Sequence, residues 1–170
     1  DTADVVLVGA DRIAANVDSV TAASGQLVVL GITVLVDADT RLEDQSDEGV
    51  REFSLADLRG GANPDFVEVR GVAVNQSTIF ATLLQRQQPD DEGQLDGRLF
   101  AFDEPDFQIL NVVVGTDGLT DFFINEDVEI SAQEFFGGAA AAGDEVQVKF
   151  LLNPPGASTP ILAEEVEIED

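Results

Sequence analysis

Carboxylates are the only side chains in this sequence that are abundant enough to suggest chemistry. The 170 residues include 34 Asp and Glu but no Cys and no His. Without these two types the chain has no thiolate nucleophile, no imidazole base, and none of the usual ligands of zinc, copper or iron–sulfur clusters. The chemistry that remains open is hydrolysis by a pair of carboxylates, or binding of a hard cation such as calcium through oxygen ligands.

The acidic residues form several short clusters that could supply ligands to a cation. None has the Asp/Asn spacing, central Gly and final Glu of the twelve-residue calcium loop. The best candidate for a metal site is the group Asp44, Asp47 and Glu48. A solvated acidic surface is the simpler interpretation of every cluster, including this one, so calcium is the only cofactor that the sequence leaves open.

A carboxylate hydrolase would also need a surface that holds its substrate. Sugar rings usually rest on aromatic faces, yet the sequence contains no Trp and no Tyr. Its 11 Phe lie mostly at strand positions or in adjacent pairs, where packing in a core explains them better. We therefore predict that the protein is not an enzyme, and a carboxylate hydrolase is the weakest of three functional hypotheses.

The balance of charge excludes further classes of partner. The formal net charge is -26, and Lys149 is the single lysine. DNA, RNA and anionic lipid surfaces attract proteins through Lys and Arg, so we expect no nucleic acid partner. No apolar run is long enough to cross a membrane as a helix, and we expect no membrane insertion.

The start of the sequence suggests where the protein works. The chain begins at Asp1 and contains no Met, which removal of a signal peptide would explain, as would simple trimming. The lack of Met and Cys also removes side chains that oxidise easily. We therefore expect a secreted protein with an extracellular or cell-surface location.

One sequence pattern occurs twice. The run Leu27–Val34, which bends at Gly31, matches Phe107–Val114, which bends at Asn111. Three more pairs of segments match in the same order: 54–61 with 131–138, 65–70 with 144–149, and 78–83 with 160–165. The chain therefore divides into an N-terminal segment (1–11), a first domain (12–88), an acidic linker (89–92) and a second domain (93–170).

Each copy predicts five short strands, with one short helix between the third and the fourth. Short runs of Val, Leu, Ile and Phe broken by Gly, Asp, Asn and Pro are typical of strands. The helix begins at a Ser with an acid three residues later, Ser54 and Asp57 or Ser131 and Glu134, and a Gly-Gly pair ends it. This order is that of a small OB-like β-barrel, so we predict an all-β fold of two tandem OB-like barrels.

The order of these motifs also resembles a known family. The motifs of the first copy are Asn16–Val20, Leu27–Thr40, Ser54–Leu58, Val67–Gly71 and Ile79–Thr82. Those of the second copy are Thr116–Asp117, Phe135–Phe136, Asp144–Lys149 and Leu162–Glu167. With them the chain resembles a bacterial repeat domain, domain of unknown function 5666. The resemblance implies tandem OB-like domains in exported proteins and no established activity, so no catalytic residues carry over.

The second copy departs from the pattern of this family at two places. Gly115 and Gly118 interrupt its third strand, and Asn153–Gly156 lengthens its last hairpin. We therefore expect the second barrel to be more open than the first.

The first ten residues lie outside both copies. Val5, Val6, Leu7 and Val8 form a β-prone apolar run, which could act as a donor strand for the sheet edge of another copy. The alternatives are that it pairs within its own subunit, or that it ends a preceding repeat. Pairing between copies would be head-to-tail, and such contacts build filaments when the rotation does not close.

These features support a leading hypothesis and a rival. The leading hypothesis is a non-enzymatic structural subunit of an extracellular or cell-surface assembly, which in its most specific form is a filament built by self-association. The rival is a monomeric secreted binding module whose acidic loops take up calcium or a cationic partner.

Overall fold

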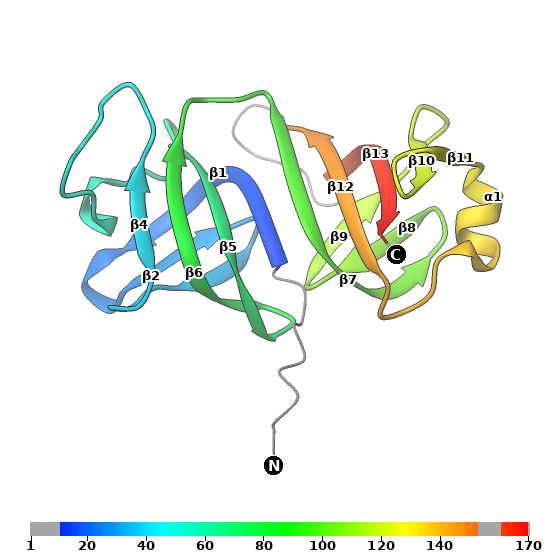
Figure 1. The fold of residues 1–170 in the computed structure, drawn as a ribbon, viewed down its shortest axis with the longest axis horizontal. Helices are drawn as coiled ribbons and strands as arrows, with labels where there is room; N and C mark the ends of the chain where they lie inside the picture. Colours follow the sequence, from blue (N-terminus) through cyan, green and yellow to red (C-terminus); the bar gives the residue numbers. More distant parts are fainter. Residues whose placement is uncertain (1–10, 153–160, 170) are drawn as a thin grey trace, which may run out of the picture.

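The computed structural model describes residues 11–152 and 161–169. In these residues the chain is mostly β-strand with a few short helical turns, arranged as two tandem units (Figure 1). The predicted β-rich tandem repeat is therefore confirmed. The predicted donor strand at Val5, Val6, Leu7 and Val8 lies outside the described residues.

The two units contain corresponding elements. The first has β1 (Asp11–Thr21), η1 (Ala22–Ser24), β2 (Gln26–Val29), β3 (Ile32–Leu35), β4 (Arg41–Asp44), η2 (Leu55–Asp57), β5 (Phe66–Asn75) and β6 (Thr78–Gln87). The second has β7 (Glu92–Asp103), β8 (Asp106–Ile109), β9 (Val112–Gly115), β10 (Asp121–Ile124), β11 (Val128–Ile130), α1 (Ala132–Glu134), η3 (Phe135–Ala139), β12 (Glu145–Leu151) and β13 (Ile161–Glu169).

The pairing of strands is the same in both units. Hydrogen-bonded neighbours lead from β1 through β2, β3, β6 and β5 back to β1. In the second unit they lead from β7 through β8, β9, β13 and β12 back to β7. Only the β3–β6 and β9–β13 pairs in these two circuits are parallel. The first strand of each unit pairs with two strands of its own unit. β1 pairs with β5 along its first half and with β2 along its second, and β7 pairs with β12 and then with β8 in the same way.

Three strands were not expected from the sequence. β4 runs parallel to β6, β10 runs parallel to β13, and β11 pairs with β10. Each has only three or four residues of mixed polarity, too few for a period-two pattern to stand out. The expected interruption of the third strand is also smaller than predicted, because β9 ends at Gly115 with the same length as β3.

The predicted helix starts are present, and one predicted helix end is wrong. The backbone N–H of Ser54 donates to the Asp57 carboxylate (2.8 Å), and that of Ser131 donates to the Glu134 carboxylate (2.8 Å). In the first unit the helical turn ends at Asp57, before the Gly-Gly pair. The helical segment is a single 3-10 turn, and Leu58, the next residue, is already in extended conformation.

The tight turns between the second and third strands place leucines in an unusual conformation. Gly31, the bend expected in the first unit, has positive φ (73°), and the residue before each expected bend is also left-handed, Leu30 (φ 51°) in the first unit and Leu110 (φ 51°) in the second. A two-residue hairpin turn of this hand matches the twist of its strands. Because a left-handed residue with a side chain costs about 1–2 kcal/mol, the repeated leucine indicates a packing role for its side chain.

The two units are joined by direct strand pairing. β1 and β7 run antiparallel, with Ile13 opposite Leu95, Arg12 opposite Asp96, and Ala14 opposite Gln94. Ile13 and Leu95 are equivalent residues, because they pair with Val69 and Val148 at corresponding places on β5 and β12. The junction is therefore nearly two-fold symmetric, and its axis passes between Ile13 and Leu95.

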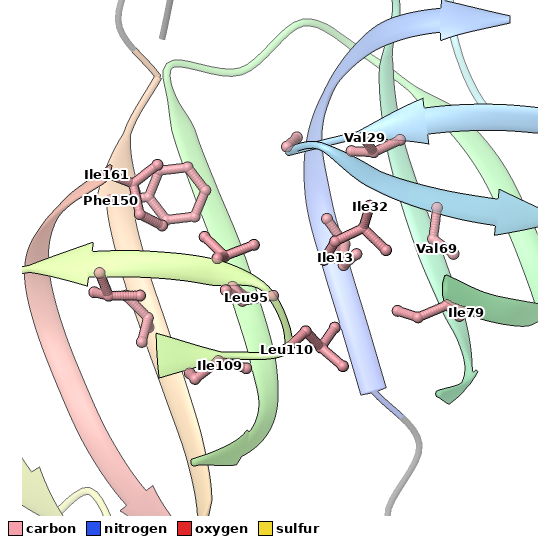
Figure 2. Close-up of a cluster of buried hydrophobic side chains, with 14 of the residues drawn as sticks. Ile13, Val29, Ile32, Val69, Ile79, Leu95, Ile109, Leu110, Phe150 and Ile161 are labelled. Atoms are coloured by element: carbon pink, nitrogen blue, oxygen red, sulfur yellow. The ribbon is translucent and has the colours of Figure 1, made fainter. Parts of the chain in front are cut away.

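Apolar side chains from both units meet around this junction. Figure 2 shows Ile13, Ile32 and Ile79 of the first unit facing Leu95 and Leu110 of the second, within one buried cluster. Close approach also depends on glycines of β7. A Cβ atom added at Gly97 would lie 2.8 Å from Cγ2 of Ile109, and one at Gly93 would lie 2.5 Å from the Phe150 ring. The two units therefore share one core.

We predict that Gly97→Ala destabilises the whole protein by about 1–3 kcal/mol, because overpacking a filled core forces side chains or backbone to shift. Chemical denaturation followed by circular dichroism measures the change. Gly118→Ala is the matched control, since nothing lies within 4 Å of a Cβ built at Gly118. Equal stability of the two variants would contradict tight packing around Gly97.

Candidate functional site

The predicted cation site contains a buried ion pair. Asp44 and Arg86 are opposite each other on the parallel strands β4 and β6, with side chains 0% and 1% exposed. Arg86 Nη2 donates to Asp44 Oδ2 (2.6 Å), and its Nε donates to Oδ1 (3.1 Å). The backbone N–H groups of Ser46 and Val50 also donate to the Asp44 carboxylate. These bonds occupy both carboxylate oxygens and hold the pKa of Asp44 far below its usual range.

The surroundings of Arg86 hold the guanidinium in place. The guanidinium carbon of Arg86, Cζ, lies 5.2 Å from the centre of the Phe53 ring, which is a cation–π distance. Glu48 contacts Arg86 Nη1 (3.2 Å) and also Arg59 (2.6 Å). Arg59 in turn binds Asp65 (2.9 Å). Arg86 is therefore the cation that this acidic segment binds in the structure.

The three predicted metal ligands are not brought together. Asp44 and Glu48 both lie against Arg86, whereas Asp47 is exposed. Within residues 11–152 and 161–169, no group of three or more acids is arranged to hold a metal ion. Sequence reasoning missed Arg86 because it lies 42 residues after Asp44, and only the unpredicted β4–β6 pairing places the two together.

The second unit has no ion pair at the equivalent position. Ile124 is opposite Ile168 on β10 and β13, in the register that Asp44 and Arg86 have in the first unit. Ile168 is buried, and Ile124 packs against the core. The same place in the fold thus accepts either a salt bridge or two isoleucines, which identifies it as a structural position.

The repeated Asp and Thr after the third strand are also structural. Thr40 donates its hydroxyl to the carbonyl of Ala81 (2.8 Å), and Thr120 donates to that of Ala163 (2.7 Å). Each hydroxyl also accepts the backbone N–H of the Asp three residues earlier, Asp37 or Asp117, at 3.1 Å. The motif fastens the turn after the third strand to the last strand of its unit.

Polar side chains cover one face of the strands that join the units. Glu68 of β5 is buried and accepts from Arg12 (3.1 Å), Arg70 (2.7 Å) and Gln87 (3.0 Å). In the second unit Lys149 binds Glu165 (3.0 Å). Most charges on this face therefore already have partners of opposite charge.

Acids without such partners gather beside β13. Glu126, Glu145, Glu167 and Glu169 line one hollow, and Glu167 is only 7% exposed. Burial, followed by repulsion from Glu126 and Glu169, raises the pKa of Glu167, and burial and nearby acids likewise raise that of Glu169. Proximity of acids alone does not make a metal site, but it does make this part of the second unit sensitive to pH.

An apolar groove lies where β12 ends and β13 begins. Its volume is ≈ 440 Å³, and its lining consists of Leu30, Asp117, Leu119, Asp121, Phe150, Leu151, Leu152, Ile161, Leu162, Ala163 and Glu164. Leu119, Leu151 and Leu162 are 86%, 55% and 52% exposed. Phe150 and Ile161 lie next to each other at its base (Figure 2). Leu30 belongs to the first unit, so the groove depends on the junction.

The symmetric position in the first unit is different. A smaller hollow of ≈ 210 Å³ is lined there by Leu110 together with Asp11, Val72, Ala73, Gln76 and Arg98. The Asp11 carboxylate accepts the backbone N–H of Ala73 (3.0 Å) and so occupies part of its lining. The two symmetric positions therefore differ in size, and the larger groove lies on the second unit.

Within residues 11–152 and 161–169, no helix has the length and apolar character that a membrane crossing requires.

Comparison with protein-family models matches the chain twice, at residues 15–85 and 96–167, to a family described as Domain of unknown function (DUF5666). The two matched segments correspond to the two structural units. No curated protein and no solved structure matches the chain.

We predict that Arg86→Leu destabilises the protein by about 3–5 kcal/mol, because it leaves the Asp44 carboxylate buried without its counter-charge. The double variant Asp44→Ile/Arg86→Ile, which copies the second unit, should recover most of this loss. Denaturant titration measures both. Arg41→Ala serves as control, since Arg41 pairs with Glu43 from an exposed position and should cost less than about 1 kcal/mol. A double variant as unstable as the single one would refute the equivalence of the two positions.

We also predict that acid stabilises the second unit. A raised pKa means that the folded state binds a proton more tightly than the unfolded state, so the contribution of Glu167 is complete below its ordinary pKa and is lost as pH rises through its raised pKa. The charged groups facing it are Glu126, Glu145, Lys149, Glu165 and Glu169. The Asp44 contribution has the opposite sign and is lost as pH falls through its lowered pKa.

The variant Glu167→Gln separates these two effects. It should raise the free energy of unfolding at pH 7 and flatten its decline between pH 4 and 7, because Gln is the residue at the equivalent position of the first unit, Gln85. Denaturant titrations over this pH range provide the measurement, with the exposed Glu52→Gln as control. A pH profile that both variants leave unchanged would exclude Glu167 as its source.

Proposed function

Because the chain belongs to the DUF5666 family and carries two tandem copies of its domain, we propose that it is a non-enzymatic structural subunit of an extracellular or cell-surface bacterial assembly. The observation that carries this proposal is the β1–β7 pairing, which joins two domains through one sheet and one core. Of the three candidate acids, Asp44 and Glu48 contact Arg86 in salt bridges.

We propose in addition that each domain is an OB-like barrel. The circuits of paired strands support closure, since each returns to its first strand. The position of the short helical segments, η2 before β5 and α1 before β12, agrees with the OB-like order of elements. Closure removes free strand edges, which protects a Val-rich and Leu-rich protein from indiscriminate aggregation.

Assembly is proposed to proceed head-to-tail by strand addition. Residues 1–11 supply the donor strand, and Val5, Val6, Leu7 and Val8 are its apolar anchors. Each copy would both give and accept a strand, and such heterologous contacts extend into a filament when they do not close. Polymers of this kind need no cofactor and no other partner than the protein itself.

We predict that the purified protein forms filaments, and that association increases with ionic strength. Copies with a net charge of -26 repel one another, but at 0.15 M salt the screening length is about 8 Å. Electron microscopy and light scattering across a salt series measure assembly. Removal of residues 1–10 should leave folded monomers, with removal of residue 170 as the control truncation. Monodisperse monomers of the whole chain under every condition would refute the proposal.

The rival function is a monomeric secreted module that binds calcium or a cationic partner. The acids beside β13 are the specific observation in its favour, because four glutamates line one hollow there, and burial together with repulsion between acids raises the pKa of Glu167. Isothermal titration with calcium distinguishes the two functions. Saturable binding without any change in light scattering would support the rival, whereas absence of calcium uptake together with filaments would support the structural subunit.

A further inference from the structure

The apolar groove of the second unit is surrounded by exposed leucines. Three leucines stand open to solvent around it, on the loop before β10 and at the facing ends of β12 and β13. Concave sites lined mainly by hydrophobic side chains with a few polar groups are typical of binding sites. The segment that connects the two sides of the groove, 153–160, has the sequence Asn-Pro-Pro-Gly-Ala-Ser-Thr-Pro. It carries no large aliphatic side chain that would fill ≈ 440 Å³.

The chain does carry one segment with suitable side chains. Val5–Val8 is a run of four consecutive aliphatic residues, and in an extended strand two of them point to each face. Two aliphatic side chains match a groove lined by leucines, Phe150 and Ile161. No other stretch outside the described residues has this composition, because residues 153–160 and Asp170 are small, polar or proline.

The path of the chain favours a groove on another copy. Asp11 lies beside Gly97, on one side of the central Ile13–Leu95 pair, while Phe150 lies beside Gly93, on the other side. Figure 1 shows this separation, since β1 starts at the lower side of the molecule and β12 ends at the upper side. Asp11, the first described residue, therefore lies on the side away from the groove.

The length of the segment before Asp11 also favours the groove of another copy. Val8 is three residues from Asp11, which spans about 10 Å when extended. Gly93 and Gly97 are four residues apart, about 13 Å along the strand, so the apolar run reaches the groove of its own copy only by folding back. A second copy placed above the first presents no such difficulty.

We infer that the groove lined by Leu30, Phe150, Leu151, Ile161 and Leu162 is the acceptor site for residues Val5–Val8 of a second copy. This inference rests on the proposed head-to-tail assembly and names its receiving surface. Donor and acceptor lie on opposite sides of the subunit, so each addition leaves a new groove open at one end of the chain of copies. The acids Asp117, Asp121 and Glu164 line the groove and face Asp4 of the incoming segment, which explains why salt should favour assembly.

Complementary variants test the inference. The first lacks residues 1–10 and can only accept, whereas the second carries Leu151→Asp and Leu162→Asp and can only donate. These leucines are exposed, so the substitutions should leave the fold intact, which circular dichroism checks. Neither variant should form filaments alone, and an equimolar mixture should form dimers that do not extend, as measured by analytical ultracentrifugation.

The first unit offers a matched control. Val72 has the position there that Leu151 has in the second unit, one residue beyond the pairs Gly71–Asp11 and Phe150–Gly93. It is also exposed, at 46%. Val72→Asp should therefore form filaments as the unmodified chain does. Loss of filaments in this control, or normal filaments from the Leu151→Asp/Leu162→Asp variant, would overturn the groove assignment.

Cross-linking decides between copies. The sequence has no Cys, so Val6→Cys or Leu7→Cys on one copy and Leu162→Cys on another supply the only thiols, and the mass of a covalent dimer tells the donor–acceptor disulfide from disulfides between identical copies. One of the two adjacent donor positions should yield a covalent dimer on oxidation. A disulfide formed only within a single chain that carries both substitutions would overturn docking between copies. If the unmodified chain fails to assemble at all, the proposed function fails; if it assembles while these variants do not discriminate, only the groove assignment fails.

Discussion

The antiparallel pairing of β1 with β7 is the interaction on which the rest of the structure depends. It places Ile13 against Leu95 on a nearly two-fold axis and converts two small domains into one sheet with one core. A domain of this size buries only a moderate fraction of its surface when it folds alone. The shared junction adds apolar burial that neither unit has by itself. It also explains the two left-handed leucines, since Leu110 and Leu30 each line a hollow together with residues of the other unit.

Around this symmetric junction the two units have diverged in their polar residues. The first unit keeps its strands together at one position with the Asp44–Arg86 ion pair, where the second has Ile124 and Ile168. A buried ion pair must repay the cost of removing two charges from water, whereas two isoleucines carry no such cost. Glu167 shows the reverse change, since it places an acid where the first unit has Gln85. The contributions of Asp44 and Glu167 to stability therefore respond to pH with opposite signs.

Much of the fold could be predicted from the sequence because it repeats. The match of 65–70 with 144–149 predicted β5 and β12, and the Ser-x-x-acid spacing predicted both helix starts. Local spacing could not predict β4 or the partner of Asp44, because both depend on a parallel pairing between segments about 42 residues apart. The groove could not be predicted from the sequence for the same reason. Its lining combines Leu30 with residues near 120, 150 and 162, and only the β1–β7 junction brings the first unit to the second.

Symmetry also constrains how such a protein can assemble further. An isologous contact uses the same surface on both partners and closes after one pairing. Here β1 and β7 already satisfy each other within one chain, so the symmetric strand edge is no longer available for other copies. Extended assembly must use features that the two units do not share. The groove of ≈ 440 Å³ lies on the second unit, whereas the hollow at the symmetric position of the first is ≈ 210 Å³, and the run Val5–Val8 precedes the first unit. The divergence of two similar domains would thus give one subunit the two unlike ends that the proposed polymer requires.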